Sequence, residues 1–245
     1  MKLKVIGFWG GYPEANEATS GYLLESKGFH LLIDCGSAVL SKLQESISID
    51  KLDAVILSHY HHDHVADIGP LQYACYVTSL LQNKQKTLPI YAHTFDQEAF
   101  KKLSYKDATK GIEYDHTKQL TIGPFTVSFL RTIHPATCFA MKISDGDSTI
   151  IYTADSSYQD EFISFSQAAD LLIAECSFYA NQDGTTAGHM TSTEVGRLAN
   201  KANVKQLLLT HLPHFGDHHD LITEAKKEYA GGISLASTGY QWSKD

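Results

Sequence analysis

Residues 58–67 read SHYHHDHVAD, and their histidines and aspartates are spaced as metal ligands often are. His59 and His61 are two residues apart, so in an extended segment both imidazoles leave the chain on the same side. Asp63 and His64 follow at once, and the chain must turn before them to aim both side chains at a second point. Because neutral imidazoles and carboxylates are common ligands of divalent metals, the segment predicts ligands for two neighbouring cations.

Two apolar runs that flank this cluster predict the elements that position it. Leu52 to Leu57 is typical of a strand that leads into the cluster, and Ile68 to Leu81 is typical of a helix that leads out of it. Loops at the carboxyl ends of strands are where α/β proteins place their chemistry. A histidine-rich surface turn is the alternative interpretation, and we apply it only to His62, which falls out of register.

Three further residues of ligand type follow predicted strands elsewhere in the chain. His134 comes after a strand that ends at Thr132, while Asp155 and His211 directly follow the runs TIIYTA and QLLLT. Singly, each has a simpler explanation, since a histidine at a strand end is often a hydrogen-bonded loop residue and Asp155 could cap a helix. Their occurrence together with the histidine cluster favours one composite metal site.

The overall composition limits the classes of partner. The chain has 245 residues and a net charge of −8, and Arg131 and Arg197 are its only arginines. A broad nucleic-acid interface needs clustered lysine and arginine, so we expect no extended interface of that kind. A small anionic substrate is compatible with this charge, because bound metal can overcome local acidity.

The cysteines and the N-terminal sequence indicate the cellular compartment. The four cysteines form no C-x-x-C pair, so we expect buried free thiols. The N-terminal run MKLKVIGFWGG enters a strand and does not resemble a signal peptide, and no apolar run reaches the length that spans a bilayer. We therefore expect a cytoplasmic protein that does not associate with membranes.

The order of predicted elements favours an α/β fold. Short β segments fill residues 111–153, and the capping-box pair Thr191 and Glu194 predicts a helix that runs through Ala202. The chain contains no linker-like stretch or internal repeat, so we expect one domain over residues 1–245. The pattern predicts a four-layer αβ/βα sandwich, in which two mixed β-sheets pack face to face with helices outside.

Taken together, these residues resemble the motifs of the metallo-β-lactamase superfamily, and the resemblance covers nearly the whole chain. It implies that one metal is bound by three histidines: His59, His61 and His134. It implies that the other metal is bound by an aspartate and two histidines: Asp63, His64 and His211. Asp155 would bridge the two metals, and the buried Asp34 would support the metal-binding loop from behind.

Two metals in such a site imply hydrolytic chemistry. Divalent cations about 3.5 to 4 Å apart repel one another, and a shared carboxylate and a shared hydroxide relieve that repulsion. The cations also lower the pKa of bound water from about 15.7 toward 7, which creates a nucleophile at neutral pH. Zinc is the expected metal, although the same nitrogen and oxygen donors can hold manganese or iron.

The superfamily contains β-lactamases, thioester hydrolases of the glyoxalase II type, lactonases, nucleases and phosphodiesterases, and the fold alone does not choose among them. Common β-lactamases carry a cysteine ligand where this chain has Asp155. Glyoxalase II enzymes add a C-terminal helical domain, for which too few residues follow His211. A lactonase or a thioester hydrolase on the same fold is the main alternative to the interpretation that follows.

The stronger resemblance is to the ribonuclease Z-like branch. The run AECS around Glu175 is similar to that branch's His-Glu-Ala-Thr strand end, and GHMT around His189 is similar to its Gly-His-x-Thr loop. The resemblance implies that Glu175 orients His189, and that a protonated His189 stabilises phosphate charge or protonates the leaving oxygen. On the plainer interpretation, His189 only precedes the helix cap at Thr191 and Glu175 is a surface carboxylate.

The chain departs from this branch at two places. Ala174 replaces the histidine of the first motif, and cysteine and serine replace its last two residues. Ribonuclease Z also inserts a long tRNA-gripping arm between the equivalents of His134 and Asp155, where this chain has room only for a hairpin. We therefore expect a phosphodiesterase for a small or cyclic phosphodiester, and rank a tRNA 3′ endonuclease and a non-catalytic metal-binding module below it.

The resemblance carries three further expectations. Asp63 could accept a proton from the attacking nucleophile in addition to binding metal. The loop Gly10 to Ser20 would border the pocket, as its counterpart does in the branch. Members of the family often dimerise, so a homodimer is compatible with the resemblance, although no stretch of the sequence points to an interface.

Overall fold

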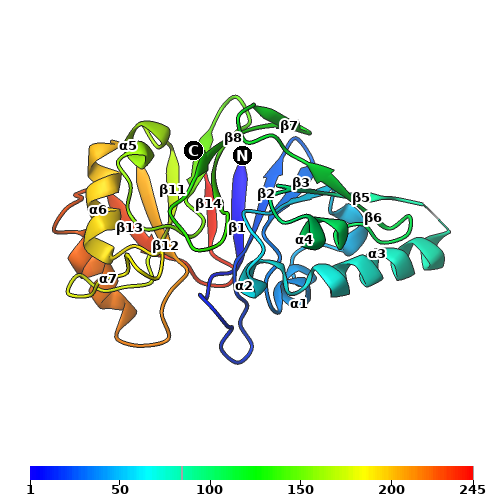
Figure 1. Cartoon of the computed structure of the whole chain (residues 1–245), viewed down its shortest axis with the longest axis horizontal. Helices are drawn as coiled ribbons and strands as arrows, with labels where there is room; N and C mark the ends of the chain where they lie inside the picture. Colours follow the sequence, from blue (N-terminus) through cyan, green and yellow to red (C-terminus); the bar gives the residue numbers. More distant parts are fainter. Residues whose placement is uncertain (84, 245) are drawn as a thin grey trace.

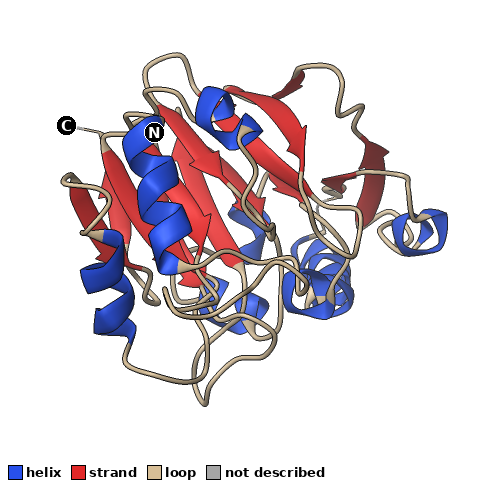
Figure 2. Cartoon of the chain, turned by 60° about the vertical axis from the view of Figure 1, so that its left-hand side comes forward, coloured by secondary structure: helices blue, strands red, loops and turns tan. Residues whose placement is uncertain are grey.

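The computed structural model describes residues 1–83 and 85–244, and it contains two seven-stranded β-sheets with helices outside them (Figures 1 and 2). The first sheet has the order β14 (Gln241–Ser243), β1 (Lys2–Gly7), β2 (Gly21–Ser26), β3 (Phe29–Ile33), β4 (Ala54–Ile56), β5 (Leu88–Ala92) and β6 (Thr109–Glu113). The second sheet has the order β13 (Gly232–Leu235), β12 (Gln206–Thr210), β11 (Leu171–Glu175), β10 (Thr149–Tyr152), β9 (Phe139–Ser144), β8 (Phe125–Arg131) and β7 (Leu120–Ile122).

The helices fall into two groups on the outer sides of the sheets (Figure 1). The group beside the first sheet comprises α1 (Val39–Leu43), η1 (Ile49–Lys51), α2 (His62–Val65), α3 (Ile68–Gln82) and α4 (Gln97–Lys101). The group beside the second sheet comprises α5 (Glu161–Phe165), α6 (Ser192–Lys201) and α7 (His218–Ala225). Each sheet combines parallel and antiparallel neighbours, so the predicted four-layer sandwich of two mixed sheets is confirmed.

Strand β3 shows how the sequence specifies these layers. Leu31 and Ile33 belong to the apolar core that contains side chains of the second sheet, whereas Leu32 belongs to the core that contains α1 and α3. Successive side chains of a strand point to opposite faces, so a strand covered on both faces is apolar at every position. The buried hydroxyls of Tyr22 and Thr210 lie 2.6 Å apart and connect the two sheets directly.

The strand directions bring several strand ends to one edge. Strands β10, β11 and β12 are parallel to one another. Strand β9 is antiparallel to both β8 and β10, so β8 runs in the same direction as β10. The carboxyl ends of β8, β10, β11 and β12 therefore lie at the same edge of the sheet. In the first sheet, β3 and β4 are also parallel. At the strand ends, Asp34, Ala154 and His211 have left-handed φ values of 56°, 50° and 52°. Such conformations are uncommon for residues other than glycine, and they turn the chain sharply where each strand ends.

Some boundaries and short elements differ from the sequence-based prediction. Strand β4 covers only three residues of the predicted run Leu52 to Leu57. The elements α2, β13 and β14 were not expected from the sequence. Strand β14 has three residues, of which only Trp242 is buried, and it pairs with β1 opposite Leu3. A segment this short carries too little periodicity to be recognised without its partner strand.

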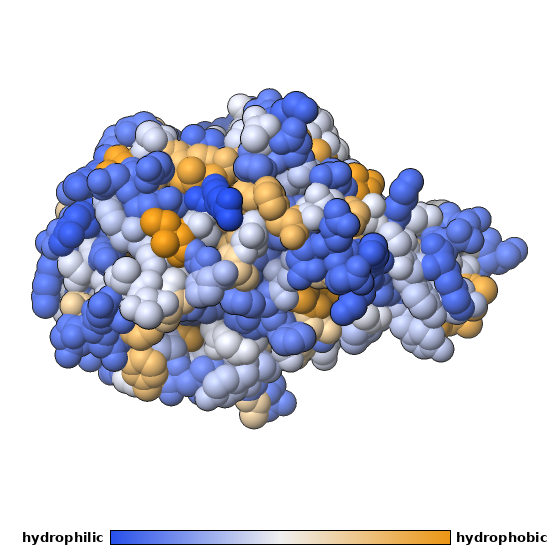
Figure 3. All heavy atoms as spheres, in the orientation of Figure 1, coloured by the Kyte–Doolittle hydropathy of each residue, from blue (hydrophilic) through white to orange (hydrophobic). Residues whose placement is uncertain are grey.

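The surface shown in Figure 3 is mostly hydrophilic, and the cysteines are free thiols. On the face shown in Figure 3, hydrophilic residues surround several small, separate apolar patches. All four cysteines are buried and unpaired, as expected. Within the described ranges, no helix combines the length and the apolar character that crossing a membrane requires.

Gly36 allows the turn after β3 to pack against the metal-binding loop. A Cβ atom at Gly36 would lie 1.9 Å from the carbonyl oxygen of Asp63 and 2.2 Å from the hydroxyl of Thr19. We predict that Gly36→Ala lowers the free energy of unfolding in urea by about 1–3 kcal/mol or more, because backbone must move. Gly69→Ala is the matched control, since its Cβ would meet nothing within 4 Å, and it should stabilise α3 by up to about 1 kcal/mol. Equal effects of the two substitutions would contradict this interpretation.

Candidate metal centre

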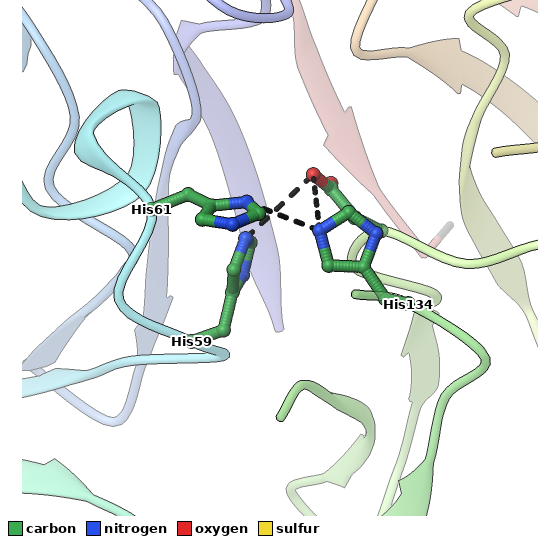
Figure 4. A group of neighbouring side chains, drawn as sticks. His59, His61 and His134 are labelled. Atoms are coloured by element: carbon green, nitrogen blue, oxygen red, sulfur yellow. Dashed lines mark hydrogen bonds and ion pairs between the residues drawn. The ribbon is translucent and has the colours of Figure 1, made fainter. Parts of the chain in front are cut away.

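Four of the predicted ligands converge on one point between the sheets. His59 and His61 come from the segment after β4, and His134 approaches from the second sheet (Figure 4). His61 Nδ1 and His134 Nε2 are 3.1 Å apart, and His59 Nε2 lies 3.7 Å from Asp155 Oδ2. The candidate ligand atoms of these four residues all lie within 4.8 Å of one another, which is close enough for a single ion.

A second group lies beside the first and shares one residue with it. His211 Nε2 lies 3.1 Å from Asp63 Oδ2, and both His211 Nε2 and His64 Nε2 lie 3.4 Å from Asp155 Oδ2. Asp155 belongs to both groups, as a bridging carboxylate would. The structure therefore brings all seven predicted ligands together, whereas His62 is exposed and belongs to neither group.

A buried aspartate fixes the orientation of two imidazoles in this centre. Asp34 Oδ2 accepts hydrogen bonds from His64 Nδ1 at 2.8 Å and from the hydroxyl of Ser58 at 2.8 Å. Because the Ser58 hydroxyl donates to Asp34, it must accept from His59 Nδ1, 3.0 Å away. In both histidines Nδ1 therefore carries a proton, and Nε2 faces the centre.

The second sheet fixes two more imidazoles in the same way. His134 Nδ1 donates to the carbonyl oxygen of Gly188 at 3.1 Å. His211 Nδ1 donates to the hydroxyl of Ser177 at 2.8 Å, and that hydroxyl donates to Glu175 Oε2 at 3.0 Å. Acceptors that hold the outer ring nitrogen are a recurrent feature of metal-binding histidines. This role of Ser177 was not expected from the sequence, although its hydroxyl stands at the position of the threonine in the His-Glu-Ala-Thr motif.

The hydrogen-bonding state of the buried atoms tests whether these residues fit metal ions. His59 Nε2, His64 Nε2 and Asp155 Oδ1 are buried and have no hydrogen-bond partner among the described residues. Burying polar atoms without partners is costly, and most buried polar atoms in proteins are satisfied. Cations at the two groups would satisfy the two nitrogens. The donor set of five imidazoles and two carboxylates suits zinc and also manganese or iron.

The protonation states match those that metal binding requires. Burial lowers the pKa of His59, His61 and His134, which keeps these imidazoles neutral. Burial opposes ionisation of Asp155, but the nearby His211 and His64 hold the pKa of its carboxyl well below the usual range. Neutral imidazole and ionised carboxylate are the ligand forms. His64 differs, because Asp155 and Asp34 outweigh burial and raise its pKa, so a cation there displaces a proton.

The loop Gly10 to Ser20 borders the second group, as expected. The backbone N–H of Gly11 donates to Asp63 Oδ2 at 2.9 Å. A Cβ atom at Gly10 would lie 2.8 Å from the ring of His211, so the loop packs directly against this histidine. The loop therefore helps to position both Asp63 and His211.

Glu175 and His189 form a buried pair next to the two groups. Glu175 is fully buried, which excludes the interpretation of a surface carboxylate. Its Oε1 atom accepts from His189 Nδ1 at 3.1 Å and from the backbone N–H of Met190 at 2.9 Å. The ring of His189 stacks on that of His211 with centroids 5.2 Å apart. Because protein donors already occupy the carboxylate, these residues form a hydrogen-bonded network and not a third cation site.

Comparison with known proteins agrees with the fold and the centre. The sequence profile of the metallo-beta-lactamase superfamily matches residues 16–227, and the chain belongs to this superfamily. It is 61% identical over 242 residues, 99% of both chains, to YhfI of Bacillus subtilis, which is named a probable metallo-hydrolase. The crystal structure of YhfI superposes with a TM-score of 0.98 over 98% of each chain. The chain is accordingly a metallo-hydrolase of the metallo-β-lactamase fold.

More distant matches include a ribonuclease Z and the structure of a protein described as a diphosphatase. Ribonuclease Z of Sulfolobus acidocaldarius is 26% identical over 273 residues, with 91% of each chain covered. The structure of a diphosphatase of the PhnP family matches with a TM-score of 0.80 and 18% identity, over 100% of this chain and 98% of that one. At this identity the second match shows a shared fold.

Binding of the predicted cations should stabilise the folded chain. After chelator treatment, we predict that added zinc raises the melting temperature by roughly 10 °C at saturating concentrations, because the cations bind only the folded protein. Two zinc ions per chain are expected by mass spectrometry. Asp155→Asn should reduce both the zinc content and the thermal shift, since the bridging charge is lost. Unchanged zinc content in this variant would contradict the bridging assignment.

Ser177 provides a separate test of the second group. Ser177→Ala removes the acceptor that holds His211 Nδ1, so we predict that the affinity for the second cation falls about 10- to 100-fold. Ser177→Thr keeps the hydroxyl and should bind metal as the wild type does. Competition with a chelating dye measures both affinities. If the alanine variant binds two cations with unchanged affinity, Ser177 does not position His211.

Proposed function

We propose that the chain is a dinuclear metal-dependent phosphodiesterase that acts on a small or cyclic phosphodiester. The pair formed by Glu175 and His189 carries this proposal, because it places a proton donor beside the two groups of ligands. Two divalent cations, when bound, would supply Lewis acidity and a water molecule acidic enough to act as a nucleophile at neutral pH.

His189 has the properties of a proton donor to a phosphate ester. Burial opposes its protonation, but the hydrogen bond and charge of Glu175, together with the charges of Asp155 and Asp63, raise the pKa of His189 to about 9. Since Nδ1 is bound to Glu175, the Nε2 proton can be donated to a phosphoryl oxygen or to the leaving oxygen. Lactone and thioester hydrolysis do not require such a donor.

Asp63 is the proposed acceptor for a proton released during the attack. Its Oδ2 atom is held by Gly11 and faces His211, which leaves Oδ1 to receive a proton. Burial opposes ionisation of Asp63, but the neighbouring imidazoles of His211 and His64 outweigh it and hold the pKa of this carboxyl below its usual range. The carboxylate is therefore ionised at neutral pH, as a proton acceptor must be.

The expected size of the substrate follows from what lies between His134 and Asp155. This interval contains the hairpin of β9 and β10 and no room for an extended arm. The net charge of −8 also disfavours a long polyanion. The similarity to a ribonuclease Z supports phosphodiester chemistry, and the short hairpin supports a smaller substrate.

The proposal predicts turnover of bis(p-nitrophenyl) phosphate and of at least one cyclic nucleotide by the zinc- or manganese-loaded protein. His189→Ala should lower kcat about 100- to 1000-fold without changing the metal content, because a donor to the transition state is lost. The control is His219→Ala, which changes an exposed histidine at the start of α7 and should have no effect.

Two outcomes would contradict different parts of this proposal. Metal-loaded protein that cleaves a lactone or a thioester but no phosphodiester would overturn the proposed function. Unchanged phosphodiester turnover by His189→Ala would remove the role of His189 while leaving the metal assignment intact.

A further inference from the structure

Three stacked aromatic rings lie at the rim of the metal centre and have no part in the chemistry described above. The rings of Trp9 and His214 stack with centroids 4.6 Å apart and planes inclined by 12°. His214 stacks in turn on Tyr12, with centroids 3.7 Å apart and planes inclined by 5°. Trp9 is buried, whereas Tyr12 is 61% exposed. The stack therefore begins in the core and ends with an open aromatic face.

Hydrogen bonds hold this stack rigidly in place. His214 Nε2 lies 3.1 Å from the carbonyl oxygen of Gly10 and 2.8 Å from that of Tyr12. Both partners are acceptors, so Nε2 carries a proton and donates to them. The backbone N–H of Gly10 also donates to the carbonyl oxygen of Leu212, which joins the two loops that supply the rings. These bonds fix the ring of His214, and the ring of Tyr12 lies flat against it, so Tyr12 loses little conformational entropy when a ligand stacks on its open face.

The stack lies next to the proposed site of hydrolysis. Tyr12 directly follows Gly11, whose N–H donates to the candidate ligand Asp63, and consecutive Cα atoms are about 3.8 Å apart. His214 comes from the loop that begins with the candidate ligand His211. Both loops lie at the lower edge of Figure 1, in dark blue and orange. The rim on which Tyr12 lies is therefore adjacent to the metal-binding groups.

Charge around Tyr12 restricts what that group can be. The loop Gly10 to Ser20 contains Glu14 and Glu17 and no lysine or arginine. This loop therefore disfavours a second phosphate and accepts a flat, uncharged group. Aromatic side chains bind nucleobases by stacking, which contributes about 5- to 100-fold in affinity per base and tolerates any base.

We propose that Tyr12, backed by His214 and Trp9, is the stacking platform for the nucleobase of a mononucleotide phosphodiester. This inference rests on the proposed function and names its substrate class. The substrate is a nucleotide with a single phosphodiester, and neither a polynucleotide nor an alkyl phosphodiester. Tyr12 determines specificity through KM, because it contacts the base and not the reacting phosphorus.

The kinetic test compares adenosine 3′,5′-cyclic phosphate with the 3′,5′-cyclic phosphate of methyl riboside, which has the same sugar and phosphate but no base. The metal-loaded wild type should have a KM about 5- to 100-fold lower for the nucleotide. Tyr12→Ala should raise the KM for the nucleotide by a similar factor and change kcat by less than about twofold. The KM for the base-free compound should also change by less than about twofold in this variant. Tyr12→Phe and Tyr12→Trp keep the platform and should restore the low KM.

A second exposed tyrosine and an equilibrium measurement complete the test. Tyr73→Ala, on the outer face of α3, is the matched control and should behave as the wild type does. Calorimetry should show that adenosine 5′-monophosphate binds the metal-loaded protein more tightly than ribose 5-phosphate, and that Tyr12→Ala removes the difference. Equal loss of affinity for both ligands would overturn the platform and leave Tyr12 as a support for the loop.

This design separates the platform from the proposed function. If the wild type cleaves no phosphodiester, the proposed function fails, and the calorimetric comparison still decides whether Tyr12 binds a base. If both cyclic phosphates are cleaved with the same KM, the phosphodiesterase function stands and the nucleobase platform is wrong.

Discussion

Five imidazoles and two carboxylates meet in a largely buried space between the sheets. The free-energy cost of burying ligand atoms without hydrogen-bond partners is the constraint on which the rest of the centre depends. His59 Nε2 and His64 Nε2 face inward without a hydrogen bond among the described residues, while their outer nitrogens are held by Ser58 and Asp34. The rings therefore cannot rotate to find other partners. An arrangement of this kind is stable when cations supply the missing interactions, and it is already oriented to receive them.

Glu175 connects the metal centre to the proposed proton donor. One of its oxygens holds His189, and the other holds the Ser177 hydroxyl that in turn holds His211. The backbone N–H groups of Ser156 and Met190 add two more hydrogen bonds to the buried carboxylate. The same buried carboxylate therefore positions both the proton donor and, through Ser177, a candidate metal ligand. We interpret this shared carboxylate as the feature that keeps the proton donor and the candidate metal ligand in fixed positions relative to one another.

The centre exists only where the two sheets meet. The first sheet contributes the segment 59–64, and the second sheet contributes the remaining ligands after β8, β10 and β12. Close approach at this junction depends on residues without side chains. A Cβ atom at Gly188 would lie 2.6 Å from Pro135 Cδ and 2.7 Å from His134 Nδ1, so a larger residue would push His134 out of place. At the same junction the backbone N–H of Gly11, the residue before Tyr12, donates to Asp63 Oδ2.

Residue types and local spacing determined much of this description. Strand β12 has the bounds of the predicted run QLLLT, and the capping box of Thr191 and Glu194 forms. The seven residues of ligand type follow strands, as their positions in the sequence predict. These features depend on neighbours in the sequence, which a single chain displays directly. Tertiary structure alone decided which nitrogen of each imidazole faces the centre, that Ser177 reaches His211, and that Tyr12 stacks on His214. Those contacts join residues far apart in the chain, and they depend on how two sheets pack and not on the order of residues within either.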